Sequence, residues 1–147
     1  MSKPLLPRNP EFETIVRESF SRQAMMTALG AKLTLVAPGR VHVAFPKLDQ
    51  FTQQNGFVHA GATASIADSA CGYAAFTLAP ADTDVLAVEF KINLLTPARA
   101  TMFEARARVL RSGRTLSTCF AEVIGVQSGD EELVATMMST IITRPKV

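Results

Sequence analysis

The densest group of polar residues in this sequence lies in residues 53–61, and Asp68 follows it. Ala60 and Gly61 come directly after His59, at the start of a segment with helical composition. Backbone N–H groups in the first turn of a helix have no partner within the helix, so they are fixed donors for negative charge. A carbonyl oxygen gains such charge when its carbon is attacked. The stretch therefore predicts an oxyanion-binding position for the hydrolysis of a carbonyl compound.

Asp68 is the candidate general base or nucleophile for the same reaction. Its helical neighbours are apolar or small: Ile66, Ala67, Ala70 and Cys71. Burial among them would raise the pKa of the carboxyl toward a range useful in catalysis. The alternative is a structural role, in which Asp68 accepts hydrogen bonds from the backbone or from a hydroxyl such as Ser65 or Ser69.

The spacing between His59 and Asp68 has a consequence for assembly. Nine helical residues correspond to a rise of about 13 Å and a rotation of about 180°, so both side chains cannot reach one small reacting group in a single chain. The sequence therefore predicts a site shared between two subunits, with Ala60 from one and Asp68 from the other.

Two helices and a series of strands must position these residues. Asn9 and Pro10 are typical of a helix start, and an amphipathic N-terminal helix is expected over about residues 10–29. A β-hairpin is expected from residues 32–37 and 40–45, with a turn between them. A central helix is expected over about residues 59–78, and its many alanines and glycines would let other backbones approach closely.

The C-terminal half alternates apolar and polar residues, which indicates long strands. The expected strands form an antiparallel meander over residues 85–94, 102–111, 115–126 and 133–143. Residues 1–147 contain no linker, repeat or charge run that would divide them, so a single domain is expected. The order of elements predicts the α+β class, with one antiparallel sheet and a helix against one of its faces.

Three segments resemble the PaaI-like acyl-CoA thioesterases of the hotdog superfamily: QNGFVHAG…IADSACGYAA, VEFKINLLTPA and the final alternating strand. The resemblance implies a hotdog fold, in which an antiparallel sheet wraps around one long helix. It also implies that Gln53 is the amide residue that contacts the substrate or the water. His59 would shape the loop, the Ala60 N–H would bind the oxyanion, and Asp68 would be the catalytic carboxylate.

The sequence departs from the family pattern at two positions. Ala60 stands where the family has a glycine, a change that a backbone donor tolerates if the methyl group leaves the substrate free. Ala87 stands where many relatives have a serine or threonine that helps to hold the attacking water. This second change bears on the rate or on the position of the water.

Composition excludes several other classes of protein. The 15 Lys and Arg against 13 Asp and Glu leave a net charge of +2 without a basic arm, so no nucleic-acid partner is expected. No stretch approaches the ~20 apolar residues of a membrane-spanning helix, so a cytoplasmic protein is expected. Cys71 and Cys119 are expected to be buried hydrophobes. No metal or nucleotide motif occurs, so neither a metal nor a separate cofactor is expected.

The resemblance makes an acyl-CoA the expected substrate and a homodimer, or a dimer of dimers, the expected assembly. The three phosphates of CoA require cations, and the candidates are Arg111 and Arg114, which flank the turn at residues 112 and 113, with Lys91 and Arg144 as further cations. The alternative for this turn is a solvated hairpin tip. Asn55 and Gly56 are further candidate substrate contacts. The expected reaction is hydrolysis of the thioester to a carboxylic acid and CoA. Two alternatives remain: a non-catalytic acyl-CoA-binding module, and a hydratase or dehydratase on the same fold.

Overall fold

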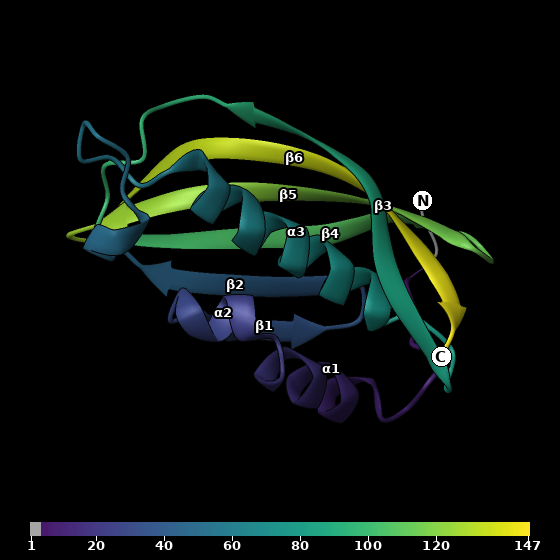
Figure 1. The fold of residues 1–147 in the computed structure, drawn as a ribbon. Coiled ribbons are helices and arrows are strands. Elements are labelled where there is room, and N and C mark those ends of the chain that lie inside the picture. The colour runs from purple at the N-terminus through teal and green to yellow at the C-terminus, as the bar shows by residue number, and fades with distance from the viewer. Residues whose placement is uncertain (1–3) are drawn as a thin grey trace.

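The computed structural model describes residues 4–147 (Figure 1). The helices are α1 (Phe12–Ser21), α2 (Ala24–Ala28), the short 3-10 helix η1 (Asp49–Phe51) and α3 (Ala60–Phe76). The strands are β1 (Lys32–Ala37), β2 (Arg40–Pro46), β3 (Thr83–Leu94), β4 (Met102–Ser112), β5 (Leu116–Gln127) and β6 (Asp130–Pro145).

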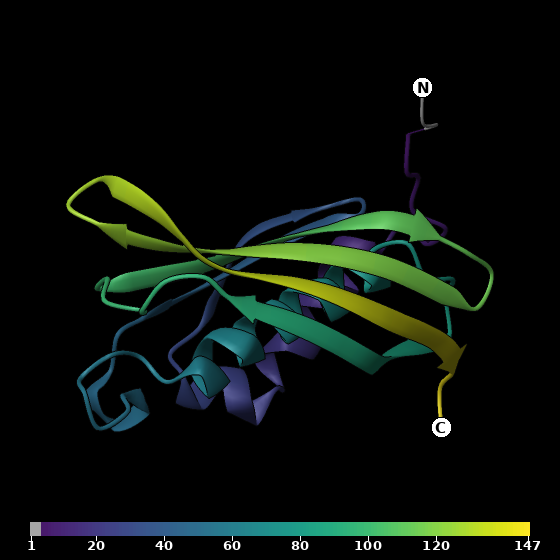
Figure 2. The ribbon, with the colours of Figure 1, turned by 90° about the horizontal axis from the view of Figure 1, so that it is seen from above.

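The six strands form one antiparallel sheet in the order β1-β2-β4-β5-β6-β3. The sheet is twisted and curves along α3, as the two perpendicular views show (Figures 1 and 2). The helices α1 and α2 lie beside β1, on the other flank of α3 from β3 (Figure 1). This arrangement confirms the predicted α+β class and the sheet wrapped around one helix.

The core lies between α3 and the inner face of the sheet. Alanines at 67, 70 and 74 are fully buried on α3, and they let the helix lie close to the strands. The largest buried side chains come mainly from the strands and from the N-terminal region: Phe45, Phe103, Met26, Leu29 and Met137. Cys71 and Cys119 are free and buried, as predicted. Burial raises the pKa of the Cys119 thiol to about 12, which keeps it protonated and unreactive.

The N-terminal helix differs from the predicted single helix over residues 10–29. It is divided into α1 and α2, and between them Gln23 has an extended backbone, with φ −81° and ψ 100°. The local sequence SRQAMM has neither glycine nor proline, so propensity alone would continue the helix. The Gln23 side chain instead turns to α3, where it accepts a hydrogen bond of 2.9 Å from the Ser69 hydroxyl. The interruption is therefore an effect of tertiary contacts.

The predicted C-terminal meander is correct for β4, β5 and β6 and wrong for β3. Strand β3 pairs with β6 alone and lies at an edge of the sheet. The physical reason is that the chain passes from β2 into α3 and then into β3, which lies on the other side of α3 from β2. The three later strands then occupy the sheet between β2 and β3. The free edge exposes large apolar side chains: Val88 is 52% exposed, Phe90 47% and Leu94 57%.

Within residues 4–147, no helix is both long and apolar enough to cross a membrane.

Candidate functional site

The start of α3 offers one free backbone donor. His59 is the N-cap residue, and its ring Nδ1 accepts a hydrogen bond of 2.8 Å from the Gly61 N–H. The next N–H, that of Ala62, donates to the His59 carbonyl oxygen at 2.9 Å. The Ala60 N–H has no acceptor within residues 4–147. Of the two donors that the sequence predicted, Gly61 is therefore engaged by His59 and Ala60 is available to a ligand.

The loop before α3 fixes the predicted amide residue in a tight turn. The Gln53 N–H donates to the Phe57 carbonyl oxygen at 2.8 Å, and the Gly56 N–H donates to the Gln53 carbonyl oxygen at 2.9 Å. Gly56 has φ +81°, a conformation that glycine adopts without strain. The side-chain oxygen of Gln53 accepts from the Asn55 N–H, so its NH₂ group is the end left free for a ligand.

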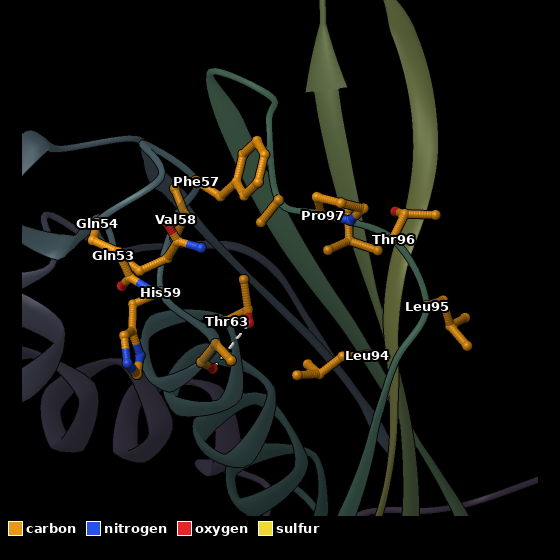
Figure 3. A pocket seen from close by; sticks show the side chains of 13 residues that line it. Gln53, Gln54, Phe57, Val58, His59, Thr63, Leu94, Leu95, Thr96 and Pro97 are labelled. Atoms are coloured by element: carbon orange, nitrogen blue, oxygen red, sulfur yellow. Dashed lines mark hydrogen bonds between the residues drawn. The ribbon is translucent and has the colours of Figure 1, made fainter.

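These groups open onto a cavity of about 510 Å³, here called the Ala60 cavity (Figure 3). Gln53, His59 and Thr63 lie on one side of it, and residues 94–97 lie on the other. The Thr63 hydroxyl does not compete for a ligand, because it donates to the Ala60 carbonyl oxygen at 3.0 Å. The cavity therefore combines a free helix-start donor and a free amide with apolar walls.

Asp68 lies in a second cavity of about 270 Å³, here called the Asp68 cavity. Its walls come from the N-terminal helices, α3 and β3: Ser19, Gln23, Ser69, Gly72, Tyr73, Phe76, Asp84, Val85, Leu86 and Ala87. The Oδ1 atom of Asp68 is inaccessible to solvent and has no hydrogen-bond partner within the described chain. Burial raises the pKa of this carboxyl. A carboxylate with a raised pKa and no internal donor is a suitable proton acceptor.

The two cavities share no lining residue in one protomer. This separation agrees with the distance expected from nine residues of helix, about 13 Å. The structure brings Gln53, His59 and Ala60 together and leaves Asp68 in the other cavity. Both cavities lie along β3, with the Asp68 cavity at residues 84–87 and the Ala60 cavity at residues 94 and 95.

The predicted substrate contacts are more scattered. Asn55 and Gly56 are exposed in the turn and line neither cavity. Arg111 and Arg114 are exposed on either side of the β4–β5 turn, and they too line neither cavity. Lys91 lies on the free edge strand, where its Nζ donates to the Asn93 side-chain oxygen at 2.9 Å.

Another of the predicted cations, Arg144, lies beside the Asp68 cavity, together with two cations that the sequence analysis did not single out. A recess of about 280 Å³, here called the cationic recess, is lined by Arg22, Arg144 and Lys146. It shares Ser19, Phe76 and Asp84 with the Asp68 cavity. None of the three cations forms an ion pair within residues 4–147. Arg22 lies more than 120 positions before Arg144 and Lys146, so no local motif could have revealed that the three converge.

The polar side chains around Asp68 were also missed. Ser19 lies on α1 and Gln23 lies between α1 and α2, and nothing in their local sequence relates them to a residue more than 40 positions later. No group of three or more His, Cys, Asp or Glu side chains in the described part of the chain could hold a metal ion.

Comparison with known proteins assigns the fold to a family. The family model described as "Thioesterase superfamily" matches residues 55–131. A thioesterase family protein from Silicibacter pomeroyi is 43% identical, with a TM-score of 0.90 over 92% of this chain and 99% of that chain. A Saccharolobus solfataricus protein, whose name provisionally assigns it to the esterases, is 34% identical over 81% of this chain and 83% of its own.

The PaaI protein of E. coli shares the fold at 20% identity, with a TM-score of 0.82 over 93% of this chain and 96% of that chain. The chain belongs to the thioesterase superfamily, and its fold is the hotdog fold. This confirms the resemblance to PaaI-like thioesterases, which the residues around His59 and Asp68 had indicated.

Proposed function

We propose that this protein hydrolyses an acyl-CoA to a carboxylic acid and CoA, and that each active site is shared between two subunits. One observation carries the proposal: a free helix-start donor, the Ala60 N–H, and a half-buried carboxyl group, that of Asp68, whose Oδ1 atom has no partner within residues 4–147, lie on one helix but in separate cavities. Each cavity by itself holds half of the groups that hydrolysis requires.

The free edge of β3 supplies a way to join the two halves. An exposed apolar edge strand is a template for pairing with another chain. If β3 pairs antiparallel with β3 of a second copy, a two-fold axis near Phe90 sets Leu86 opposite Leu94 of that copy. Leu86 lines the Asp68 cavity and Leu94 lines the Ala60 cavity. The pairing therefore brings the Asp68 cavity of each subunit against the Ala60 cavity of the other.

The proposed reaction uses groups from both subunits. The thioester carbonyl oxygen accepts a hydrogen bond from the Ala60 N–H, and the Gln53 NH₂ group donates to the same oxygen or to the water. Asp68 of the other subunit removes a proton from a water whose oxygen attacks the carbonyl carbon, or its carboxylate attacks that carbon directly. The C–S bond then breaks, and the CoA thiolate leaves and is protonated. In the direct route, a water then hydrolyses the mixed anhydride that has formed on Asp68, which releases the carboxylic acid and restores the carboxylate. The charge that develops on the oxygen is stabilised by the fixed donor at the start of α3.

The cationic recess is the proposed contact for the CoA phosphates. Its position next to the Asp68 cavity favours it over Arg111 and Arg114, which line neither cavity. None of its three cations forms an ion pair within residues 4–147, so all three are free to bind phosphate. Arg144→Ala with Lys146→Ala should raise KM for an acyl-CoA at least about tenfold and leave KM for the matching acyl-pantetheine, which has none of the three phosphates, nearly unchanged. Arg111→Ala with Arg114→Ala is the matched comparison. A larger effect of the second pair would assign the phosphates to the β4–β5 turn.

Thiol release from aryl-, short- and medium-chain acyl-CoAs tests the activity. The shared site is tested by co-expressing an Asp68→Asn chain with a Gln53→Ala chain, because one of the two hybrid sites then holds both intact groups. A statistical mixture should recover about a quarter of wild-type activity. In the control, the Asp68→Asn chain is paired with a chain that carries both substitutions, and no hybrid site is complete. Equal activity in the two mixtures would exclude a shared site.

A further inference from the structure

The interruption between α1 and α2 places an amide in the Asp68 cavity. The Gln23 backbone carbonyl oxygen accepts from the N–H groups of Met26 at 3.0 Å and Thr27 at 3.2 Å, so the backbone itself starts α2. The Gln23 side chain makes no capping hydrogen bond to α2. The side chain is half-buried and reaches α3 instead. The extended backbone at Gln23 is therefore accompanied by a side chain that contacts α3 and not α2.

The contact with α3 fixes the direction of the amide. The Ser69 hydroxyl donates to the Gln23 Oε1 atom at 2.9 Å, and Ser69 is the residue next to Asp68. With the oxygen engaged, the NH₂ group is the free end, and it has no acceptor within residues 4–147. Gln23, Ser69 and Asp68 all line the same cavity.

The remaining walls of the cavity are mostly engaged or apolar, although one O–H of the Ser19–Tyr73 pair stays free and Asp84 adds a second carboxyl group. The hydroxyl groups of Ser19 and Tyr73 are 3.2 Å apart and bond each other. On the β3 side, Ala87 presents only a methyl group, and its neighbours Val85 and Leu86 are apolar. Asp68 is half-buried and lines the cavity, so the part of its carboxyl group that the cavity reaches is complementary to the unpartnered Gln23 NH₂ group, and the cavity is large enough for a water between them.

We infer that Gln23 is a positioning residue that holds the hydrolytic water against Asp68. The water donates one hydrogen to the Asp68 carboxylate and accepts a hydrogen bond from the Gln23 NH₂ group. Its remaining lone pair points to the carbonyl carbon, and its proton passes to Asp68 when the new C–O bond forms. Ser69 acts through Gln23 by fixing the amide. This inference rests on the proposed function, because it assigns a role within the same site.

Three full-length variants and a control test the inference. Gln23→Leu removes the amide at similar volume, and Gln23→Glu keeps an oxygen for Ser69 but replaces the donor with a second carboxyl group. Ser69→Ala leaves the amide in place without its anchor. Ser21→Ala is the control, because Ser21 lies next to the break, donates to the Glu18 carbonyl oxygen at 2.7 Å and does not line the cavity.

A positioning role predicts a fall in kcat of about 10- to 100-fold for Gln23→Leu, with KM within about twofold. Ser69→Ala should show a smaller fall of the same kind, and Ser21→Ala should match the wild type. A structural role would lower thermal stability and raise KM as well. Wild-type kcat in a folded Gln23→Leu variant would overturn the inference.

A titration of the Asp68 carboxyl by NMR supplies a readout that does not depend on turnover. The charged and titratable groups around it are Asp84 on β3, Arg22 at the end of α1, and Tyr73 and Cys71 on α3. Loss of a donor to the water bound by the ionised carboxyl should raise its pKa in Gln23→Leu. Gln23→Glu should also raise the pKa of Asp68, because a second carboxylate then faces it. An unchanged pKa in both variants would contradict the inference.

The experiments distinguish a failure of the proposed function from a failure of the role assigned to Gln23. If Asp68→Asn keeps normal turnover, the proposed function of the site is wrong. If Asp68→Asn is inactive while Gln23→Leu retains wild-type kcat and pKa, the site stands and only the role of Gln23 is wrong.

Discussion

Asp68 occupies an environment that does little to stabilise its charge. One carboxyl oxygen is inaccessible and without a partner in the described chain, and burial raises the pKa of the group. A buried carboxylate without a donor carries a desolvation cost that a neutral residue would avoid. Such a cost, in a cavity that also gathers polar groups from α1, α3 and β3, is typical of a functional residue rather than a structural one.

Asp68→Asn should therefore change activity and stability in opposite directions. Turnover should fall by about 10²–10⁴, as expected for a lost general base. Between the ordinary pKa of 3.8 and the raised value, the folded protein binds the Asp68 proton more tightly than the unfolded chain, so stability falls as pH rises through this window. Above the window the variant should be more stable than the wild type. Urea unfolding at about pH 3 and about pH 7, beside thiol-release assays, measures both effects.

A variant that is less stable than the wild type at neutral pH would contradict this sign. A variant that keeps more than half of the turnover would show that Asp68 is not catalytic.

Ala60→Pro separates the backbone of Ala60 from its side chain. The N–H that proline deletes has no acceptor within residues 4–147, and proline is favoured at the first helical position. The preceding His59 has the extended backbone (φ −62°, ψ 138°) that a residue before proline requires. The fold should survive, while kcat falls by the equivalent of about 3–4 kcal/mol. Ala60→Gly, which keeps the donor, should retain most of the activity.

Circular dichroism of Ala60→Pro confirms that α3 is intact. A folded Ala60→Pro variant with near-normal kcat would assign carbonyl polarisation to the Gln53 amide instead.

At the scale of elements, α3 depends on small residues. Ala67, Ala70 and Ala74 have no exposed surface, and the strands approach the helix at the distance that a methyl group allows. Gly72, on the same helix, has no atom within 4 Å of the place where a Cβ would lie. One face of α3 is therefore filled, whereas Gly72 faces open space in the Asp68 cavity.

Ala70→Leu and Gly72→Ala should shift stability in opposite directions. Ala70→Leu inserts three carbons into a filled core and should cost about 1–3 kcal/mol of the free energy of unfolding. Gly72→Ala should add about 0.5–1 kcal/mol, because alanine loses less backbone entropy in a helix. Denaturant unfolding at fixed protein concentration measures both. An unchanged free energy of unfolding in Ala70→Leu would mean that the strands can move to accommodate the larger side chain at this position.

At the scale of the whole molecule, the free edge of β3 is the unusual feature. Its exposed apolar residues would favour aggregation if the protein worked as a monomer. Pairing between two copies would cover this edge and complete two sites at once. Assembly and activity are then expected to be lost together.

Phe90→Lys should abolish both assembly and activity. The side chain lies near the proposed two-fold axis, so in a dimer of the variant the lysines of the two subunits would lie close together. Their like charges would repel each other at an interface from which water is largely excluded. Sedimentation should show a monomer, and thiol release should fall to the level of Asp68→Asn. Leu110→Lys, at an exposed leucine of β4 that is 44% accessible, is the matched control and should keep both properties. A fully active monomeric Phe90→Lys variant would exclude the shared site.

The sequence by itself determined the class of fold, most strand positions, the central helix and the spacing of Gln53, His59 and Asp68. These features depend on local periodicity, on turn residues and on helix geometry, and each of these is determined by residues that are close together in the sequence. The spacing even indicated that Asp68 could not join Ala60 within one chain, and the structure indeed places the two residues in separate cavities.

Only the tertiary structure decided the break at Gln23, the place of β3 at the sheet edge and the convergence of Arg22, Arg144 and Lys146. The local sequence around Gln23 favours helix, and a contact with Ser69 on α3 overrides that preference. The edge position of β3 follows from how α3 crosses the sheet. Each of these features depends on contacts between residues far apart in the chain, and no pattern of neighbouring residues encodes such contacts.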